Sequence, residues 1–177
     1  MTLPLARTKV LLPKDLERRS ALLRDAGKTV VLTNGCFDLL HVGHVRYLEA
    51  ARALGDALVV GVNGDRSVCH LKGPGRPLVG EDERAEVVAA LASVDWVVLF
   101  QEDTATALVR MLQPSLYVKG GDYDGDPSSP QFPPEGQEVL AHGGVVRILP
   151  HIPGASTSGL VRRARERRAT GGYNAGS

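Results

Sequence analysis

The sequence predicts an α/β fold: a doubly wound, parallel five-stranded sheet with helices on both faces. Short apolar runs alternate along the chain with segments in which apolar residues recur at helical spacing. This alternation is typical of a mostly parallel sheet covered by helices. Polar residues also gather directly after the apolar runs, where such a sheet binds its ligands. With 177 residues the chain can bury about 70% of its unfolded surface, enough for one substantial core.

The expected strands are short apolar runs, at residues 30–33, 57–62, 96–100, 116–118 and 145–149. The expected helices lie at residues 15–25, 44–54, 81–92, 105–112 and 135–141, with a last helix from about Ser156. Gly27 is expected to end the first helix. We expect one Rossmann-like domain over residues 1–168, with 1–27 as a leading helix segment. Residues 169–177, rich in glycine, asparagine and serine, are expected to form a flexible tail.

The composition argues against several classes of protein. A formal net charge of +1 disfavours nucleic-acid binding, which calls for a pronounced basic excess or patch. Basic residues near the C-terminus are interrupted by Glu166, which favours a solvated helix face. Cys36 and Cys69 form no Cys-x-x-Cys pair, so we expect no disulfide framework and a cytoplasmic location. Residues 1–14 lack a long apolar core, so neither a signal peptide nor a membrane span is expected.

The most informative stretch is residues 33–44, Thr-Asn-Gly-Cys-Phe-Asp-Leu-Leu-His-Val-Gly-His. It combines a strand end, a glycine turn and two histidines, His41 and His44, at the start of a helix. A helix start offers unpaired backbone N–H groups and roughly half a positive charge, which suits an anion. Residues three apart lie on one helix face, and Gly43 lets a nucleotide approach the backbone closely. The stretch therefore predicts a phosphate-binding site.

Two other interpretations of the histidines are weaker. A zinc site of the protease type needs His-Glu-x-x-His, and this segment has no such glutamate, so no metal site is predicted. The pair could also be polar residues satisfied at a helix start, but the neighbouring Asn-Gly and Asp disfavour that. Further polar clusters follow the second, fourth and fifth expected strands, at residues 63–65, 119–122 and 150–158. Because the carboxyl ends of parallel strands meet at one edge, one shared site is expected.

The His-x-Gly-His element after Gly-x-Phe-Asp resembles the nucleotidylyltransferase superfamily, which contains cytidylyltransferases for glycerol phosphate and choline phosphate and several adenylyltransferases. The wording of residues 33–44 is most similar to the heptose 1-phosphate adenylyltransferases of ADP-heptose synthesis. Further matches lie at residues 71–77, 94–98, 118–123 and 156–158. The resemblance covers roughly residues 28–165, and its motifs together are far more specific than His-x-Gly-His alone.

The resemblance implies transfer of AMP from ATP, with Mg²⁺, to D-glycero-D-manno-heptose 1-phosphate, giving ADP-heptose and pyrophosphate. A phosphate with a second pKa near ~6 attacks without a general base at neutral pH. The protein then has to position the substrates and neutralise charge on phosphoryl oxygens. The family's bifunctional members also carry a kinase domain, for which this chain has no room. We therefore expect a stand-alone adenylyltransferase, acting on small molecules, without nucleic acid or membrane, as a homodimer.

The resemblance also assigns roles to residues. His41 and His44 are expected to bind phosphate oxygens, each protonated there at little cost, with Lys72 reaching the triphosphate from a glycine-flanked mobile loop. The residues expected to bind the nucleotide are Asn34, Gly35, Cys36, Phe37, Gly43, Lys119, Gly120, Asp122, Ser156, Thr157, Ser158 and Arg162. Those expected to bind the acceptor are Asp38, Asn63 and Arg76. An exposed lysine, a helix cap at 156–158 and a turn residue at Asp38 are the plainer alternatives.

The choice of nucleotide and acceptor rests on departures from the relatives' patterns. Glycerol phosphate cytidylyltransferases usually carry two arginines where this chain has Ala92 and His151, so ATP is favoured over CTP. The segment of residues 124–134 is longer and richer in proline than the corresponding connection in the heptose family. The identity of the acceptor sugar is therefore left undecided. The alternatives are a glycerol 3-phosphate cytidylyltransferase, an enzyme like FAD synthetase, and a nucleotide-binding module without turnover.

Overall fold

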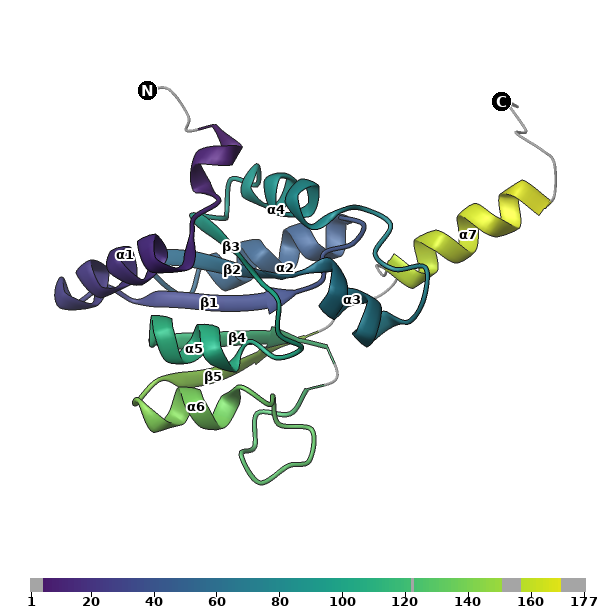
Figure 1. Ribbon diagram of the computed structural model, residues 1–177. Helices are drawn as coiled ribbons and strands as arrows, with labels where there is room; N and C mark the ends of the chain where they lie inside the picture. The colour runs from purple at the N-terminus through teal and green to yellow at the C-terminus, as the bar shows by residue number, and fades with distance from the viewer. Residues whose placement is uncertain (1–4, 122, 151–156, 170–177) are drawn as a thin grey trace.

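A computed structural model describes residues 5–121, 123–150 and 157–169 of the chain, and Figure 1 shows a single parallel sheet within that part. Its strands are β1 Val30–Gly35, β2 Ala57–Asn63, β3 Trp96–Phe100, β4 Leu116–Gly120 and β5 Val145–Leu149. They are hydrogen-bonded in the order β3-β2-β1-β4-β5, and every pair is parallel. The predicted five-stranded, doubly wound α/β fold is therefore confirmed.

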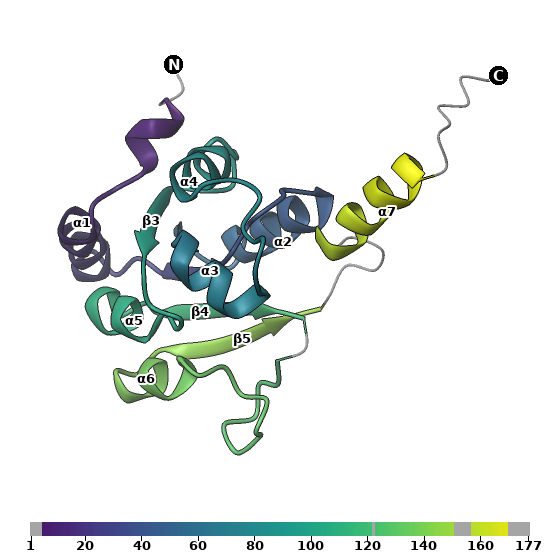
Figure 2. The same cartoon turned by 45° about the vertical axis from the view of Figure 1, so that its right-hand side comes forward.

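Helices cover both faces of this sheet (Figures 1 and 2). They are α1 Pro13–Asp25, α2 Val42–Arg52, α3 Asp65–Lys72, α4 Glu81–Ala89, α5 Thr106–Leu112, α6 Gly136–Ala141 and α7 Thr157–Ala169, after a 3-10 turn η1 Ala6–Lys9. Helices α2 and α4 pack on one face, whereas α1, α5 and α6 pack on the other. No helix within the described ranges is long and apolar enough to cross a membrane.

Two apolar cores result from the alternation of side chains along the central strands. Val31 of β1 belongs to the core under α2 and α4, and its neighbours Val30 and Leu32 belong to the core under α1, α5 and α6. Successive side chains of a strand point to opposite faces, so a strand covered on both sides must be apolar throughout. This explains why the central strands were visible in the sequence as unbroken apolar runs.

The strand order reverses between β1 and β4: β2 and β3 are added on one side of β1, and β4 and β5 on the other. This switch point shapes the functional site. Within the described residues, β1 and β4 pair only at Val31 with Leu116 and at Leu32 with Tyr117. Both described strands then continue for three more residues without pairing to each other. In contrast, β1 stays paired with β2 up to Gly35. A crevice at the carboxyl ends of β1 and β4 is where a doubly wound sheet binds its ligand.

The structure corrects several predicted boundaries. Helix α3 and the turn η1 were not predicted, and Lys72 is the last residue of α3 rather than part of a glycine-flanked loop. Helix α4 ends at Ala89 instead of residue 92, because the chain then turns to bury Val94 in the core. Strands β1 and β4 each run two residues further than predicted. The expected tail falls almost entirely outside the described residues.

Candidate active site

A cavity of about 790 Å³ opens at the carboxyl ends of the strands, within the size range of small-molecule sites. Most of the predicted site residues line it. They are Asn34, Gly35, Cys36, Phe37, Asp38, His41, Gly43, His44, Asn63, Lys72, Arg76, Lys119, Gly120, Thr157 and Ser158. Arg162 lines an adjoining hollow together with Lys72 and Arg76. Asp122 and Ser156 lie outside the described residues, so the structure gives no position for them.

The two histidines form a stacked pair at the start of α2. His41 is the N-cap residue and His44 lies in the first turn, and their ring centroids are 3.9 Å apart at an interplanar angle of 25°. The ring of Phe37 packs against His44 at 5.3 Å. This arrangement places two imidazoles beside the unpaired backbone N–H groups of a helix start, so both can face the same anion.

Burial keeps His44 uncharged in the free protein. Desolvation, and then the positive charge of His41, lowers the pKa of His44 from 6.5 to about 4. Protonating it at pH 7 therefore costs about 4 kcal/mol, at about 1.4 kcal/mol for each pH unit. The expectation that each imidazole is protonated at little cost against a phosphate stays a prediction for the nucleotide-bound site, and the lowered pKa of His44 in the free protein opposes it. Its Nδ1 is buried and accepts or donates no hydrogen bond within the described part of the chain.

Asp38 and Arg76 hold the segment between α3 and α4 against the loop of residues 36–41, which joins β1 to α2 and is called the histidine loop. The Asp38 carboxylate forms a partly buried ion pair with Arg76 and accepts hydrogen bonds from the backbone N–H groups of Leu78 (2.6 Å) and Val79 (3.2 Å). Both side chains line the cavity, but these contacts occupy the Asp38 carboxylate. Asp38 therefore positions the loop before α2, and its predicted contact with the acceptor stays a prediction.

Arg84 is a central residue that the sequence did not reveal. It is 1% exposed and donates hydrogen bonds to the backbone carbonyl of Cys36, to the carbonyl of Val79 (2.9 Å) and to the Asp65 carboxylate (2.7 Å). It thereby ties the loop that precedes the histidines to α3 and α4. In the sequence, Arg84 stands among four acidic residues, Glu81, Asp82, Glu83 and Glu86, and resembles any exposed helix residue.

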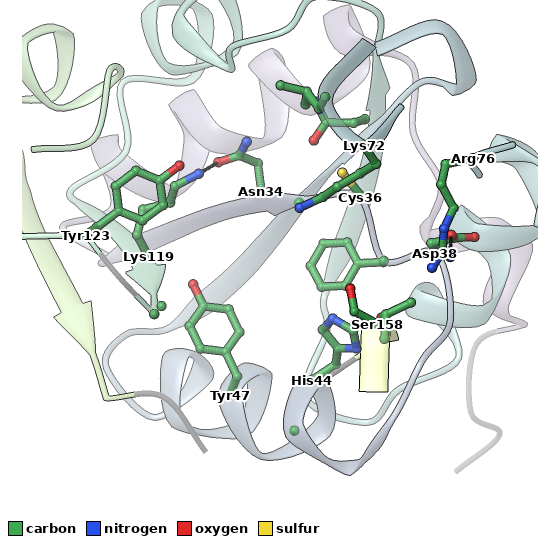
Figure 3. A pocket seen from close by; sticks show the side chains of 18 of the residues that line it. Asn34, Cys36, Asp38, His44, Tyr47, Lys72, Arg76, Lys119, Tyr123 and Ser158 are labelled. Atoms are coloured by element: carbon green, nitrogen blue, oxygen red, sulfur yellow. Dashed lines mark hydrogen bonds and ion pairs between the residues drawn. The ribbon is translucent and has the colours of Figure 1, made fainter. Parts of the chain in front are cut away.

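A polar bridge spans the crevice between β1 and β4. Asn34 Oδ1 accepts hydrogen bonds from the Tyr117 hydroxyl and from Lys119 Nζ, the latter at 3.0 Å. The Lys119 ammonium also lies 4.9 Å from the ring centroid of Tyr123, within cation–π range. Desolvation lowers the pKa of Lys119, while the nearby Glu135 carboxylate opposes that shift. Figure 3 shows Asn34, Lys119 and Tyr123 together, across the cavity from His44 and Ser158.

The remaining predicted residues differ in their exposure and in their hydrogen-bond partners. Asn63 is buried and donates to Ser67 Oγ at 3.0 Å. Lys72 is exposed at the end of α3, where Gly73, with a positive φ of +89° that favours glycine, terminates the helix and begins the loop. Burial raises the pKa of the Cys36 thiol. Thr157 Oγ1 donates to the Leu39 carbonyl at 3.2 Å, which connects the start of α7 to the histidine loop.

A comparison with known families identifies the family to which a chain with this site belongs. Residues 32–162, which include every cavity element from β1 to α7, match the cytidylyltransferase-like family. The chain belongs to the cytidylyltransferase-like family. It is thus a nucleotidyltransferase, and the stacked histidines at the start of α2 lie where the fold gathers its ligand-binding loops.

Individual proteins of known sequence are also similar to this chain. The chain is 46% identical to the bifunctional protein HldE of Syntrophotalea carbinolica, over 93% of this chain and 32% of that protein. It is 49% identical to HldE of Photobacterium profundum, over 88% of this chain and 32% of that protein. The chain thus spans about a third of the length of the curated relatives it matches.

A solved structure agrees with the fold of this family member. The crystal structure of the lipopolysaccharide core biosynthesis protein from Thermoplasma volcanium superposes with a TM-score of 0.57 at 28% identity. The match covers 71% of this chain and 98% of that one.

Several cavity residues of this nucleotidyltransferase received no role from the sequence, although Gly121 and Pro150 lie within clusters that were expected at the site. The residues without a predicted role are Tyr47, Leu71, Asp103, Thr104, Gly121, Tyr123, Pro134, Glu135 and Pro150. Asp103 and Thr104 follow β3, so the rule that ligands meet strand ends could have found them. Glu135 gave no such signal, because it follows the irregular, proline-rich segment and looked like an ordinary helix start.

Proposed function

We propose that this chain is a heptose 1-phosphate adenylyltransferase, which transfers AMP from ATP to D-glycero-D-manno-heptose 1-phosphate and releases pyrophosphate. The observation that carries the proposal is the stacked pair His41 and His44 at the start of α2, inside the cavity that also holds Lys72 and Ser158. Identities of 46–51% to bifunctional HldE proteins over most of the chain support the motif resemblance to this family.

The reaction needs charge stabilisation more than proton transfer. An oxygen of the acceptor phosphate forms a bond to the α-phosphorus of ATP, and the bond between that phosphorus and the bridging oxygen of the β-phosphate breaks. Pyrophosphate leaves with the electron pair. Neutral His44 can donate an N–H to a phosphoryl oxygen, and the start of α2 adds backbone N–H groups. Lys72 supplies a positive charge from the end of α3.

We further propose that Mg²⁺ enters the site with ATP. Within the described residues, no group of three or more His, Cys, Asp or Glu side chains is placed to hold a metal ion. Mg²⁺ is commonly bound through substrate phosphates with one or two carboxylates rather than by an all-protein cage. In that mode the triphosphate oxygens would supply most of the ligands, and the ion would neutralise phosphate charge while His41, His44 and Lys72 position the oxygens.

ATP is the proposed nucleotide although the family is named for cytidylyl transfer. Ala92 and His151 replace the two arginines usual in glycerol phosphate cytidylyltransferases, and His151 lies outside the described residues. A homodimer that acts on small molecules rather than nucleic acid completes the proposal. Pyrophosphate release should be fastest with ATP and heptose 1-phosphate. Preference for CTP, or for glycerol 3-phosphate or flavin mononucleotide, would replace the proposal with one of those alternatives.

The histidine pair is tested by substitution. His41→Asn and His44→Asn should each lower turnover about 10²–10³-fold, the scale for losing one preorganised donor in the transition state. The matched control is His142→Asn, because His142 lies at the end of α6 against the Pro114 carbonyl and does not line the cavity. Near-normal turnover in a folded His44→Asn variant, or equal loss in His142→Asn, would contradict the catalytic assignment.

A further inference from the structure

Glu135 places a buried carboxylate at the end of the cavity that the histidines do not occupy. It stands immediately before α6, its side chain lines the cavity, and it is only 2% exposed. Its Oε1 accepts a hydrogen bond from the backbone N–H of Ala105 at 2.9 Å. Its Oε2 is buried and, within the described residues, forms no hydrogen bond of normal geometry, because the nearby Tyr117 hydroxyl, which interacts with the Glu135 carboxylate, donates its proton to Asn34 Oδ1 instead.

Such an oxygen requires an explanation, because burying an acceptor without a donor costs about 1–3 kcal/mol, and more when the group is charged. Nearly all buried polar atoms in native proteins have a partner. The position of Glu135 in the cavity wall means that a bound molecule can supply the missing donor. The hydrogen bond to Ala105 meanwhile fixes the carboxylate, so Oε2 is held in place before any ligand arrives.

The surroundings of Glu135 select the kind of ligand. Lys119, which is 8% exposed, gives one hydrogen bond to Asn34 and has N–H donors left. The positive charge of Lys119 and the negative charge of Glu135 attract each other. This end of the cavity therefore offers a fixed acceptor beside a fixed donor, the pattern that binds neighbouring hydroxyl groups. A triphosphate fits the opposite end, because a buried carboxylate repels an anion.

We propose that Glu135 binds a hydroxyl of the acceptor sugar and thereby determines which sugar phosphates this enzyme uses. The proposal rests on the proposed function and names the acceptor subsite: Glu135 Oε2 accepts from the hydroxyl, and Lys119 Nζ donates to an adjacent oxygen. It thereby moves Lys119, which the motif resemblance assigned to the nucleotide, to the acceptor. Figure 3 places Lys119, Asn34 and Tyr123 on the far side of the cavity from His44 and Ser158. A sugar at this end leaves its phosphate directed toward the histidines.

The test compares Glu135→Gln with Glu138→Gln. The amide keeps an oxygen for Ala105 but replaces the acceptor at Oε2 by a donor. Glu138 lies on α6 in an exposed ion pair with Arg110, so its variant is a matched control. Calorimetry measures the affinity of each folded protein for heptose 1-phosphate and for its single-deoxy analogues, and separately for ATP. We expect Glu135→Gln to bind the sugar phosphate about 10–100-fold more weakly, with ATP affinity within twofold of wild type.

The deoxy series makes the assignment specific. One deoxy analogue should bind wild type about 10–100-fold more weakly than the parent sugar and should bind Glu135→Gln no more weakly than wild type. Wild type that tolerates every deoxy sugar equally would overturn the proposal, even where Glu135→Gln fails to fold. Weakened ATP binding in Glu135→Gln would instead assign the carboxylate to the base. Sugar binding that depends on Glu135, without pyrophosphate release, would refute the proposed function and leave this subsite standing.

Discussion

The buried His44 should make the protein less stable in mild acid, by an amount that the pKa sets. Its pKa is about 4 in the folded protein and 6.5 for an ordinary histidine. The unfolded chain therefore binds a proton more readily than the folded one, so stability falls as the pH drops below 6.5. From pH 7 to pH 5 this linkage removes about 2 kcal/mol of unfolding free energy, and the loss is complete below pH 4.

The measurement compares wild type with His44→Gln, which has no titrating group at this position. Urea denaturation at pH 7, 6 and 5 gives the unfolding free energy of each protein. Other titrating groups contribute to both proteins and cancel in the difference. Wild type should lose about 2 kcal/mol more than His44→Gln between pH 7 and pH 5. NMR of the imidazole gives an independent value of the same pKa.

Two results would refute this reasoning. The first is a parallel loss of stability in wild type and His44→Gln over the whole range. The second is an imidazole signal of His44 that titrates near pH 6.5 in the free protein. Saturating ATP with Mg²⁺ should raise the pKa of His44, because an adjacent phosphate favours the charged ring. The stability difference between the two proteins should then shrink when nucleotide is present.

Three substitutions test other parts of the site. Lys72→Ala should lower turnover about 100-fold without changing the melting temperature, whereas Lys14→Ala on exposed α1 should change neither; equal turnover in both variants would contradict the assignment. Asp38→Ala should cost about 1–2 kcal/mol in urea denaturation, because it removes the partner of the partly buried Arg76 and the acceptor of two backbone N–H groups, and unchanged stability would contradict the anchoring role. Gly120→Ala should cost about 1–3 kcal/mol, since a Cβ there meets the Tyr47 ring at 2.9 Å; unchanged stability would show that the ring yields.

The sheet and most of the cavity were predictable because their signals are local. The central strands are buried on both faces, so each is a continuous apolar run that needs no knowledge of its neighbours. The histidine loop follows one such run directly. Once the strands are placed, the carboxyl ends of a parallel sheet bring Asn34, Asn63 and Lys119 to one edge without further information.

Helix α3 was missed because its start depends on a residue far along the chain. The backbone N–H of Asp65 donates to the Glu81 carboxylate of α4 at 2.6 Å, in place of a local cap. The buried residues of α3 are Ser67 and Val68, which give no apolar spacing to detect. Arg84 and Glu135 escaped prediction for a similar reason: each is a buried charged residue that hydrogen-bonds to groups 19 or more positions away, although Arg84 also contacts the nearby Val79 carbonyl.

These hidden residues explain how a loop can hold catalytic groups in place. A site must keep its donors within about 0.5 Å of the productive geometry, which requires support from packed neighbours. Arg84 fixes the backbone at Cys36, and Asp38 ties the same loop to the segment between α3 and α4. His41 and His44 follow within a few residues and stack on each other. Substituting Arg84 would therefore reduce catalysis without removing any group that contacts the substrate.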